Sequence, residues 1–263
     1  MMQRPLLILV AILLLPVTAC ATDDYSDDAE KPDESVVEAI PYTSSWSAEP
    51  HIDLFDRGSE LVRAAIEGGR HASFYGVYES YPGYVEALGY PDFSIADITG
   101  IVSKGNPGRG PISPSTYWYH IADITVTAEE ITAEVCDDRT LAVPSEARGR
   151  HGHAWVVTLQ NTTDSPGLPG LPDLDPQSVD PGVHRVPDWN VYGSWKITRL
   201  RTGGQNPREN IPHPACTQWW LSRHPDTVKV FDNYTYTPVG DVAAVPVAPQ
   251  FPEWIGPSQP RVP

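Results

Sequence analysis

The chain has 263 residues, and its 34 acidic and 18 basic side chains give a formal net charge of −16 at pH 7. Nucleic acids and anionic lipids also carry negative charge, so this balance argues against binding to either. A uniform acidic excess otherwise indicates solubility and names no partner.

A short apolar run, residues 6–15, follows Arg4 near the N-terminus. This is the pattern of an export signal, and the run is about half of the 20 apolar residues that a membrane-spanning helix needs. The letters VTAC at 17–20 resemble a bacterial lipobox. That resemblance implies that a signal peptide, residues 1–19, is removed and that Cys20 carries acyl chains. The alternative is an ordinary A-x-A cleavage site, which would release the protein.

Export and lipidation together predict a protein on the extracytoplasmic face of the cell membrane, held there by its lipid anchor. Residues 20–48 are expected to form an acidic, disordered tether, because the first part of this stretch has many acids and few apolar residues. These acids are Asp23, Asp24, Asp27, Asp28, Glu30, Asp33 and Glu34.

Two helices are expected after the tether. Residues 51–69 place apolar side chains on one stripe at helical spacing, with acids in the first turn, and Gly68-Gly69 supplies a C-terminal stop. This predicts an amphipathic helix of about four turns. Further along, Pro82 begins a short helix that ends at Gly89.

From residue 93 the pattern changes to strands, because β-branched and aromatic residues become dense. The expected strand segments are 93–105, 115–138, 153–163 and 194–203, and Glu129-Glu130 is the expected hairpin turn within the second. A weaker β-like segment covers 227–239.

Two proline-rich segments interrupt or follow these strands. Residues 161–189 are rich in proline, which removes backbone donors, so we expect a long insertion there and not a central strand. Prolines also recur from Pro238 to Pro263, which predicts an extended tail.

Cys136 and Cys216 remain once Cys20 is lipidated. In an oxidising compartment such a pair usually forms a disulfide. The alternatives are two buried thiols or half of a metal site, but neither cysteine has a C-x-x-C partner.

The order of these elements resembles the nuclear transport factor 2-like, cystatin-like cone domains of exported actinobacterial lipoproteins. The matching motifs run from Val126 to Cys136 and from Gly193 to Ile197. The resemblance covers about residues 50–202 and implies an α+β domain, residues 49–205, in which N-terminal helices pack on a curved antiparallel sheet. Residues 206–263 are then a C-terminal extension.

Cone domains of this kind include ketosteroid isomerases and polyketide cyclases, in which a carboxylate or histidine inside the cone moves a proton. The candidates here are Asp97, His120 and Asp123, all on strand-like segments. An acid–base pair requires both groups to face one pocket, whereas a lone polar residue in a strand commonly faces solvent.

His151 and His153 lie on one side of an extended segment, and a third ligand, His184 or His213, would complete a zinc or copper site. A solvent-facing pair is the simpler interpretation. The sequence lacks the serine-hydrolase, P-loop, dinucleotide and zinc-protease motifs. We therefore expect no cofactor.

The aromatic segment between the two helices is the predicted contact region, with Tyr78, Tyr81 and Tyr84 at its centre. Such aromatics also plug the mouth of a cone. The expected function is a non-catalytic binding or interaction module for an envelope protein or a small apolar ligand. The alternatives are a cone-pocket enzyme and a passive surface antigen.

Overall fold

The computed structural model describes residues 42–89, 97–98, 114–141, 152–163, 165, 167–173, 185–202, 214–225, 227–231, 235–238 and 246–256. Residues Ala39–Pro263 form one compact unit. Its elements are β1 (Tyr42–Ala48), α1 (Arg57–Tyr75), a 3-10 turn (Val77–Glu79), α2 (Tyr84–Ala87), β2 (Asp97–Ile98), β3 (Ser115–Val126), β4 (Glu130–Leu141), β5 (Ala154–Asn161), β6 (Trp195–Thr202), α4 (Pro214–Arg223), β7 (Thr227–Phe231) and β8 (Thr235–Pro238). The protein is therefore α+β, as the sequence predicts.

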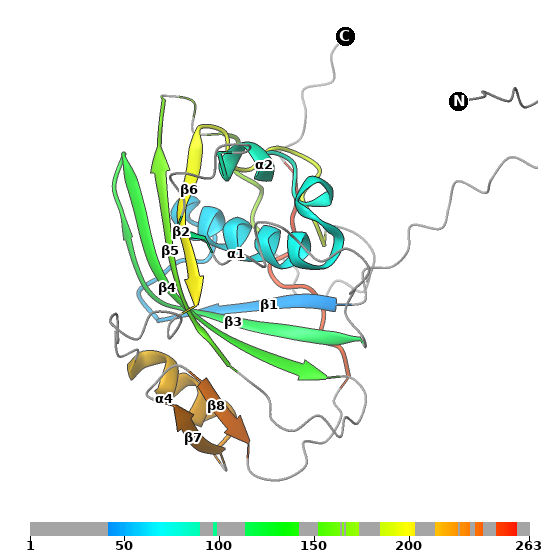
Figure 1. The fold of residues 1–263 in the computed structure, drawn as a ribbon, viewed down its shortest axis with the longest axis vertical. Coiled ribbons are helices and arrows are strands. Elements are labelled where there is room, and N and C mark those ends of the chain that lie inside the picture. Colours follow the sequence, from blue (N-terminus) through cyan, green and yellow to red (C-terminus); the bar gives the residue numbers. More distant parts are fainter. Residues whose placement is uncertain are drawn as a thin grey trace, which may run out of the picture. The chain divides into compact units, whose positions relative to one another are not determined.

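The main sheet has six strands in the order β1-β3-β4-β5-β6-β2, and helix α1 lies across one of its faces (Figure 1). The four central strands are antiparallel neighbours. Both edges differ from the expected antiparallel sheet, because β1 runs parallel to β3 and β2 runs parallel to β6. Parallel neighbours need a crossover connection, and the helices between β1 and β3 provide it. Strands β7 and β8 pair separately as an antiparallel hairpin.

The hairpin predicted at Glu129-Glu130 is confirmed. Strands β3 and β4 pair from Val126 opposite Ile131, and β4 begins at Glu130. The hydroxyl of Thr127 closes the turn by accepting hydrogen bonds from the Glu129 and Glu130 amides at 3.3 and 2.9 Å.

Helix α1 continues past the predicted stop, and Gly68-Gly69 lies inside it. Helix packing explains this difference. A side chain on Gly68 would place its Cβ 2.6 Å from the Tyr192 hydroxyl and 2.9 Å from the Tyr84 ring. The glycine therefore permits close approach of α1 to its neighbours, and the helix ends instead at Gly76, whose φ is +105°.

The tether ends earlier than predicted, because residues 42–48 form β1. Tyr42 and Trp46 of this strand are buried in the main hydrophobic core. The predicted tether was too long because it included residues 42–48, which contain aromatic and β-branched side chains and favour a strand. The rest of the predicted tether and the signal peptide lie outside the described residues.

Part of the predicted extended tail, residues 246–256, packs against the edge of the sheet. The Trp46 amide donates to the Phe251 carbonyl at 2.8 Å, and the Phe251 amide donates to the Ser44 carbonyl at 2.9 Å, so this C-terminal segment extends the β1 edge. Trp254 is buried in the core. The proline-rich insertion also contacts this segment, because the Leu171 amide donates to the Ile255 carbonyl at 2.8 Å. Among the described helices, none is long and apolar enough to cross a membrane.

Candidate functional site

The face of the sheet beneath α1 is where a cone enzyme would hold its substrate, and here it is packed with side chains. Tyr119 of β3, Leu159 of β5 and Ile197 of β6 are fully buried in one cluster with α1. Tyr84 and Tyr192 fill the space beside Gly68, and the Tyr192 hydroxyl donates to the Ala64 carbonyl at 2.7 Å. These aromatic rings leave the described part of this face as packed core.

A buried carboxylate, Glu67 of α1, lies within that core and is 1% exposed. Its Oε1 accepts a hydrogen bond from the Trp46 indole at 2.6 Å. Its Oε2 accepts from the Tyr81 hydroxyl at 2.9 Å, the Trp254 indole at 3.0 Å and the Gln250 amide at 3.2 Å. Four donors from β1, the loop after α1 and the C-terminal segment therefore converge on one side chain.

Burial raises the pKa of Glu67 above its ordinary value, while the nearby Arg63 charge and the hydrogen bonds oppose that shift. A general base needs an oxygen that can reach a substrate proton. Both oxygens of Glu67 accept hydrogen bonds from protein donors. The carboxylate therefore has a structural role, because it joins three chain segments.

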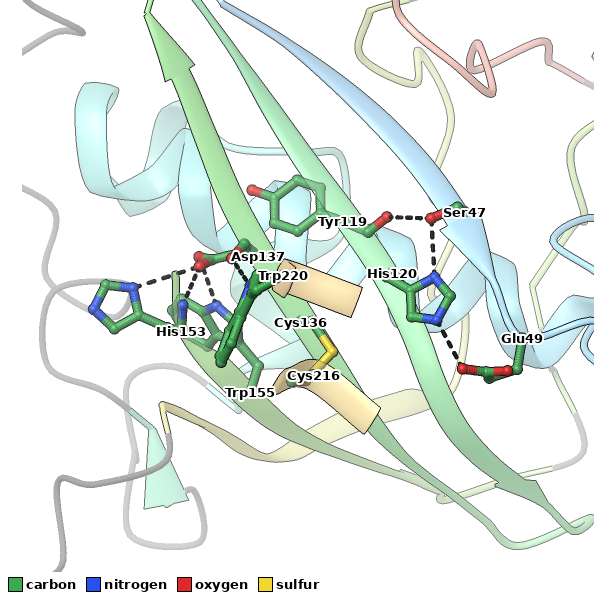
Figure 2. Close-up of a disulfide and its surroundings, with 10 residues drawn as sticks. All are labelled: Ser47, Glu49, Tyr119, His120, Cys136, Asp137, His153, Trp155, Cys216 and Trp220. Carbon is green, nitrogen blue, oxygen red and sulfur yellow. Dashed lines mark hydrogen bonds and ion pairs between the residues drawn. A yellow bond between two sulfur atoms is a disulfide. The ribbon is translucent and has the colours of Figure 1, made fainter. Parts of the chain in front are cut away.

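A second buried carboxylate, Asp137 of β4, lies on the same face of the sheet. It accepts hydrogen bonds from the His153 amide at 2.6 Å, the Trp155 indole at 2.9 Å and the Arg70 guanidinium at 3.1 Å (Figure 2 shows the first two donors). Burial alone would raise its pKa, but the His153 and Arg70 interactions outweigh burial and hold that pKa below its ordinary value. Asp137 is thus a paired carboxylate that ties β4 to β5 and α1.

The opposite face of β4 carries the disulfide. Cys136 and Cys216 are bonded with their Cα atoms 5.3 Å apart, which confirms the predicted pair and attaches α4 to the sheet (Figure 2). The Trp220 indole of α4 donates to the Asp137 carbonyl at 2.9 Å. Asp138, whose side chain is fully buried, lies 3.0 Å from Arg223 Nε and 2.7 Å from His224 Nε2. Helix α4 is therefore held by the disulfide, by the Arg223–Asp138 ion pair and by the Trp220 and His224 hydrogen bonds.

His120 of β3 lies on this α4 face, where its ring stacks on Trp219. Its Nδ1 is 2.9 Å from the Ser47 hydroxyl, and its Nε2 is 3.2 Å from Glu49 Oε1 (Figure 2). Burial lowers the pKa of His120, while Glu49 opposes that shift. The hydroxyl–imidazole–carboxylate order is that of a nucleophile, its base and an orienting acid.

The geometry of Ser47, His120 and Glu49 also fits a purely structural link between β1 and β3. The Ser47 hydroxyl also donates to the Tyr119 carbonyl at 3.3 Å, so its proton has a second acceptor besides the imidazole. In the serine-protease triad the serine contacts Nε2, whereas here it contacts Nδ1, the nitrogen nearer the main chain. The trio therefore holds the imidazole between two strands.

Of the acid–base candidates Asp97, His120 and Asp123, the described side chains of His120 and Asp123 do not face one pocket. His120 faces α4 and not the α1 face, and Asp123 is exposed beside an irregularity in the β3–β4 pairing. Such an irregularity re-aims the side chains around it, which a simple alternation rule does not anticipate. Asp97 lies in β2, beside Arg199 of β6, and its side chain is outside the described part.

The predicted aromatic contact region divides into buried and exposed residues. Tyr81 and Tyr84 are buried, and Tyr78 is 64% exposed. Phe74 and Tyr75 are partly buried against the core, and Tyr90 lies outside the described residues. Tyr81 and Tyr84 therefore fill the core, as the plugging alternative predicts. Tyr78 is the exposed member of the three predicted contact residues.

Of the predicted metal-ligating histidines, His153 lies beside Asp137 at 3.4 Å, whereas His151, His184 and His213 lie outside the described residues. The described residues contain no group of three or more His, Cys, Asp or Glu side chains that could hold a metal ion. Cys20 is likewise outside the described part.

Helix α1 also carries a charged stripe that was not among the predicted site residues. Glu60, Arg63, Glu67 and Arg70 recur at spacings of three and four, and the first three are buried. The spacing itself is the signal, but on an amphipathic helix a charged stripe ordinarily faces solvent. Here the insertion and the C-terminal segment cover it.

No protein-family model, curated protein or solved structure matches this chain.

Proposed function

We propose that this chain is an exported, lipid-anchored envelope protein whose folded part is a non-catalytic binding or interaction module. The lipobox-like residues before Cys20 support the anchor, and the α+β architecture with α1 on an antiparallel core is compatible with a cone of the nuclear transport factor 2-like kind.

The observation that carries the non-catalytic part is the packing of the α1 face. A cone enzyme needs a cavity there with a carboxylate or histidine aimed into it. Instead, Glu67 has four protein donors and Asp137 is paired with Arg70 and His153. The cone-pocket enzyme is the less supported alternative, because His120 faces α4 and Asp123 is exposed.

The anchor is tested by membrane fractionation of the full chain and of Cys20→Ala. The wild-type protein is expected to stay with membranes after a high-salt wash, because two or more acyl chains hold a protein stably. The Cys20→Ala protein is expected in the soluble fraction, whereas Thr22→Ala, a matched change just after the proposed lipid site, should remain bound. Retention of Cys20→Ala on membranes would contradict the anchor.

A further inference from the structure

The C-terminal segment, residues 246–256, lies along the edge of β1 as an added strand. The Trp46 amide donates to the Phe251 carbonyl at 2.8 Å, and the Phe251 amide donates to the Ser44 carbonyl at 2.9 Å. Phe251 therefore lies opposite Ser45 in a parallel bridge. Addition of an extended segment to a sheet edge is a common mode of peptide recognition, in which main-chain hydrogen bonds give affinity and side-chain pockets give specificity.

Two buried side chains anchor the segment, because Trp254 is 1% exposed and Gln250 is 6% exposed. The Trp254 indole and the Gln250 amide donate to the same oxygen of Glu67, at 3.0 and 3.2 Å. The Ser44 amide donates to Gln250 Oε1 at 2.8 Å. The guanidinium carbon of Arg63 lies 4.5 Å from the centre of the Trp254 ring. The protein therefore recognises an amide and an indole that are four residues apart.

Main-chain contacts extend this recognition in both directions along the segment. The Thr43 hydroxyl donates to the Ala248 carbonyl at 2.8 Å, and the Ala248 amide donates to the Thr116 hydroxyl at 2.9 Å. The Glu253 amide donates to the Asp173 carboxylate at 3.0 Å. We call the residues that hold the segment the segment site, which consists of Thr43, Ser44, Trp46, Glu67, Thr116 and Asp173.

The segment site and its occupant are separate parts of the sequence. Every residue of the site lies at or before residue 173, whereas the occupant begins at residue 246. A buried charge commonly gives less stability than a well-packed apolar side chain, and its best-attested use is to fix register. Glu67 therefore selects the segment that brings Gln250 and Trp254 to it. A second copy of the chain carries that same segment.

We propose that two copies of this chain exchange residues 246–256, so that the segment of each copy fills the segment site of the other in a two-fold dimer. Exchange of an identical element is a low-cost route to a dimer, because each copy regains from its partner the contacts that it gives up in itself. Exchange also keeps the β1 edge paired, whereas an uncovered edge is open to unrelated strands. The inference rests on the proposed interaction function and names a second copy as the partner.

Disulfide trapping between copies tests the exchange. One full-length chain carries Ser45→Cys and another carries Phe251→Cys. Both also carry Cys20→Ala, so the introduced cysteine is the one thiol outside the Cys136–Cys216 bond. Residues opposite each other on neighbouring strands are about 5 Å apart, within the range of bonded cysteines. The result is independent of the membrane anchor, which fractionation tests separately.

The two chains are mixed in urea, refolded together at about pH 6, where thiols are mostly protonated, and then oxidised at about pH 8. The segment of the same chain competes at an effective concentration in the millimolar range. We therefore expect a disulfide-linked heterodimer at about 1 mM protein and little of it at about 10 μM. The matched control pairs Ser45→Cys with Leu221→Cys, on an exposed residue of α4, and should give only chance cross-links.

A single chain with both Ser45→Cys and Phe251→Cys is the positive control and should form the bond internally at about 10 μM. If it does, and the mixed chains give no more dimer than the Leu221→Cys pair, the exchange is overturned. Light scattering gives a measurement without introduced thiols. A wild-type chain that is entirely monomeric after refolding at about 1 mM would also overturn the proposal.

Complementary changes test whether Glu67 directs the recognition. Trp254→Phe is added to the Ser45→Cys chain, and Glu67→Gln is added to the Phe251→Cys chain. Each chain alone then lacks the hydrogen bond between the Trp254 indole and the Glu67 carboxylate, and exchange restores it. The yield of linked dimer should rise about fivefold, the effect of one hydrogen bond. Trp254→Phe on both chains should leave the yield unchanged, and equal yields from the two combinations would overturn the proposed recognition.

Discussion

Glu67 of α1 and Asp137 of β4 are both buried between α1 and the sheet, and they differ in the charge of their hydrogen-bond donors. Asp137 is paired with Arg70 and His153, and its pKa is held below the ordinary value. Glu67 receives its hydrogen bonds from neutral side chains, and burial raises its pKa although the nearby Arg63 charge opposes that shift. Donor number is therefore not enough to decide the pKa of a buried acid, since the charge of the donors also counts.

Replacing Glu67 with Gln is expected to destabilise the fold by about 2–4 kcal/mol, because the amide nitrogen would face donors that need an acceptor. The measurement is the urea midpoint of the purified full chain. Glu86→Gln, the same change at an exposed position of α2, should leave the midpoint nearly unchanged. A Glu67→Gln protein as stable as wild type would show that the four contacts contribute little.

Acid should destabilise the protein through His71. Burial lowers the pKa of His71 from its ordinary value to about 4. Between about pH 6.5 and pH 4 the unfolded chain therefore binds a proton that the folded chain does not, and stability falls as the pH falls through this window, by up to about 3 kcal/mol.

The His71→Asn variant tests this sign. Compared with wild type, its free energy of unfolding should fall less steeply between pH 6.5 and pH 4, because the titrating group is gone. His51→Asn removes an exposed histidine and should keep the wild-type slope. Identical slopes in His71→Asn and wild type would refute the assignment.

At the scale of elements, consecutive residues of β4 bind opposite layers of the protein. Asp137 points toward α1, whereas Cys136 and Asp138 point toward α4. This follows from the two-residue period of a strand. Strand β4 therefore connects the two helices, and each connection can be tested separately.

Loss of the disulfide should loosen α4 more than α1. The 80-residue separation corresponds to at most about 4.5 kcal/mol by the chain-entropy relation. Hydrogen exchange of the Cys136→Ala, Cys216→Ala double variant should show lost protection in α4, with α1 amides still protected. Unchanged α4 protection would mean that Asp138 and Trp220 alone hold that helix.

Gly68→Ala is expected to destabilise α1, although alanine normally favours a helix by about 1 kcal/mol over glycine. The added Cβ would lie 2.6 Å from the Tyr192 hydroxyl and would collide with the Tyr84 ring. The thermal midpoint is the readout, and it should fall by several degrees. A raised midpoint would show that the interface yields to the extra methyl group.

At the scale of the molecule, local patterns were enough for most elements. The segments dense in β-branched and aromatic residues form β3 to β6, and the predicted pair, Cys136 with Cys216, is a disulfide. The patterns failed where distant segments meet. Locally, Gly68 predicts the end of a helix, but Tyr192 packs against it and the helix continues. The proline-rich C-terminal segment predicts a tail, but Gln250 and Trp254 donate hydrogen bonds to Glu67.

The candidate sites show the same limit. Strand position alone made His120 and Asp123 candidates for an acid–base pair, but face and register separate them. The charged stripe of α1 was visible as spacing, yet its burial depends on two segments more than 100 residues away, as the Glu60 contact with Gly170 and the Glu67 contact with Gln250 illustrate. Tertiary contacts of this kind leave no local signal.

In the part of the chain that the structure describes, we conclude that the face beneath α1 is packed core. Urea unfolding of Tyr84→Ala, compared with Tyr78→Ala, tests it most directly. Tyr84 is fully buried and Tyr78 is 64% exposed. We predict a loss of about 3–5 kcal/mol for Tyr84→Ala, as for other large core truncations, and within about 0.5 kcal/mol of wild type for Tyr78→Ala. Wild-type stability in Tyr84→Ala would contradict the claim, because it would mean that this ring faces an open space.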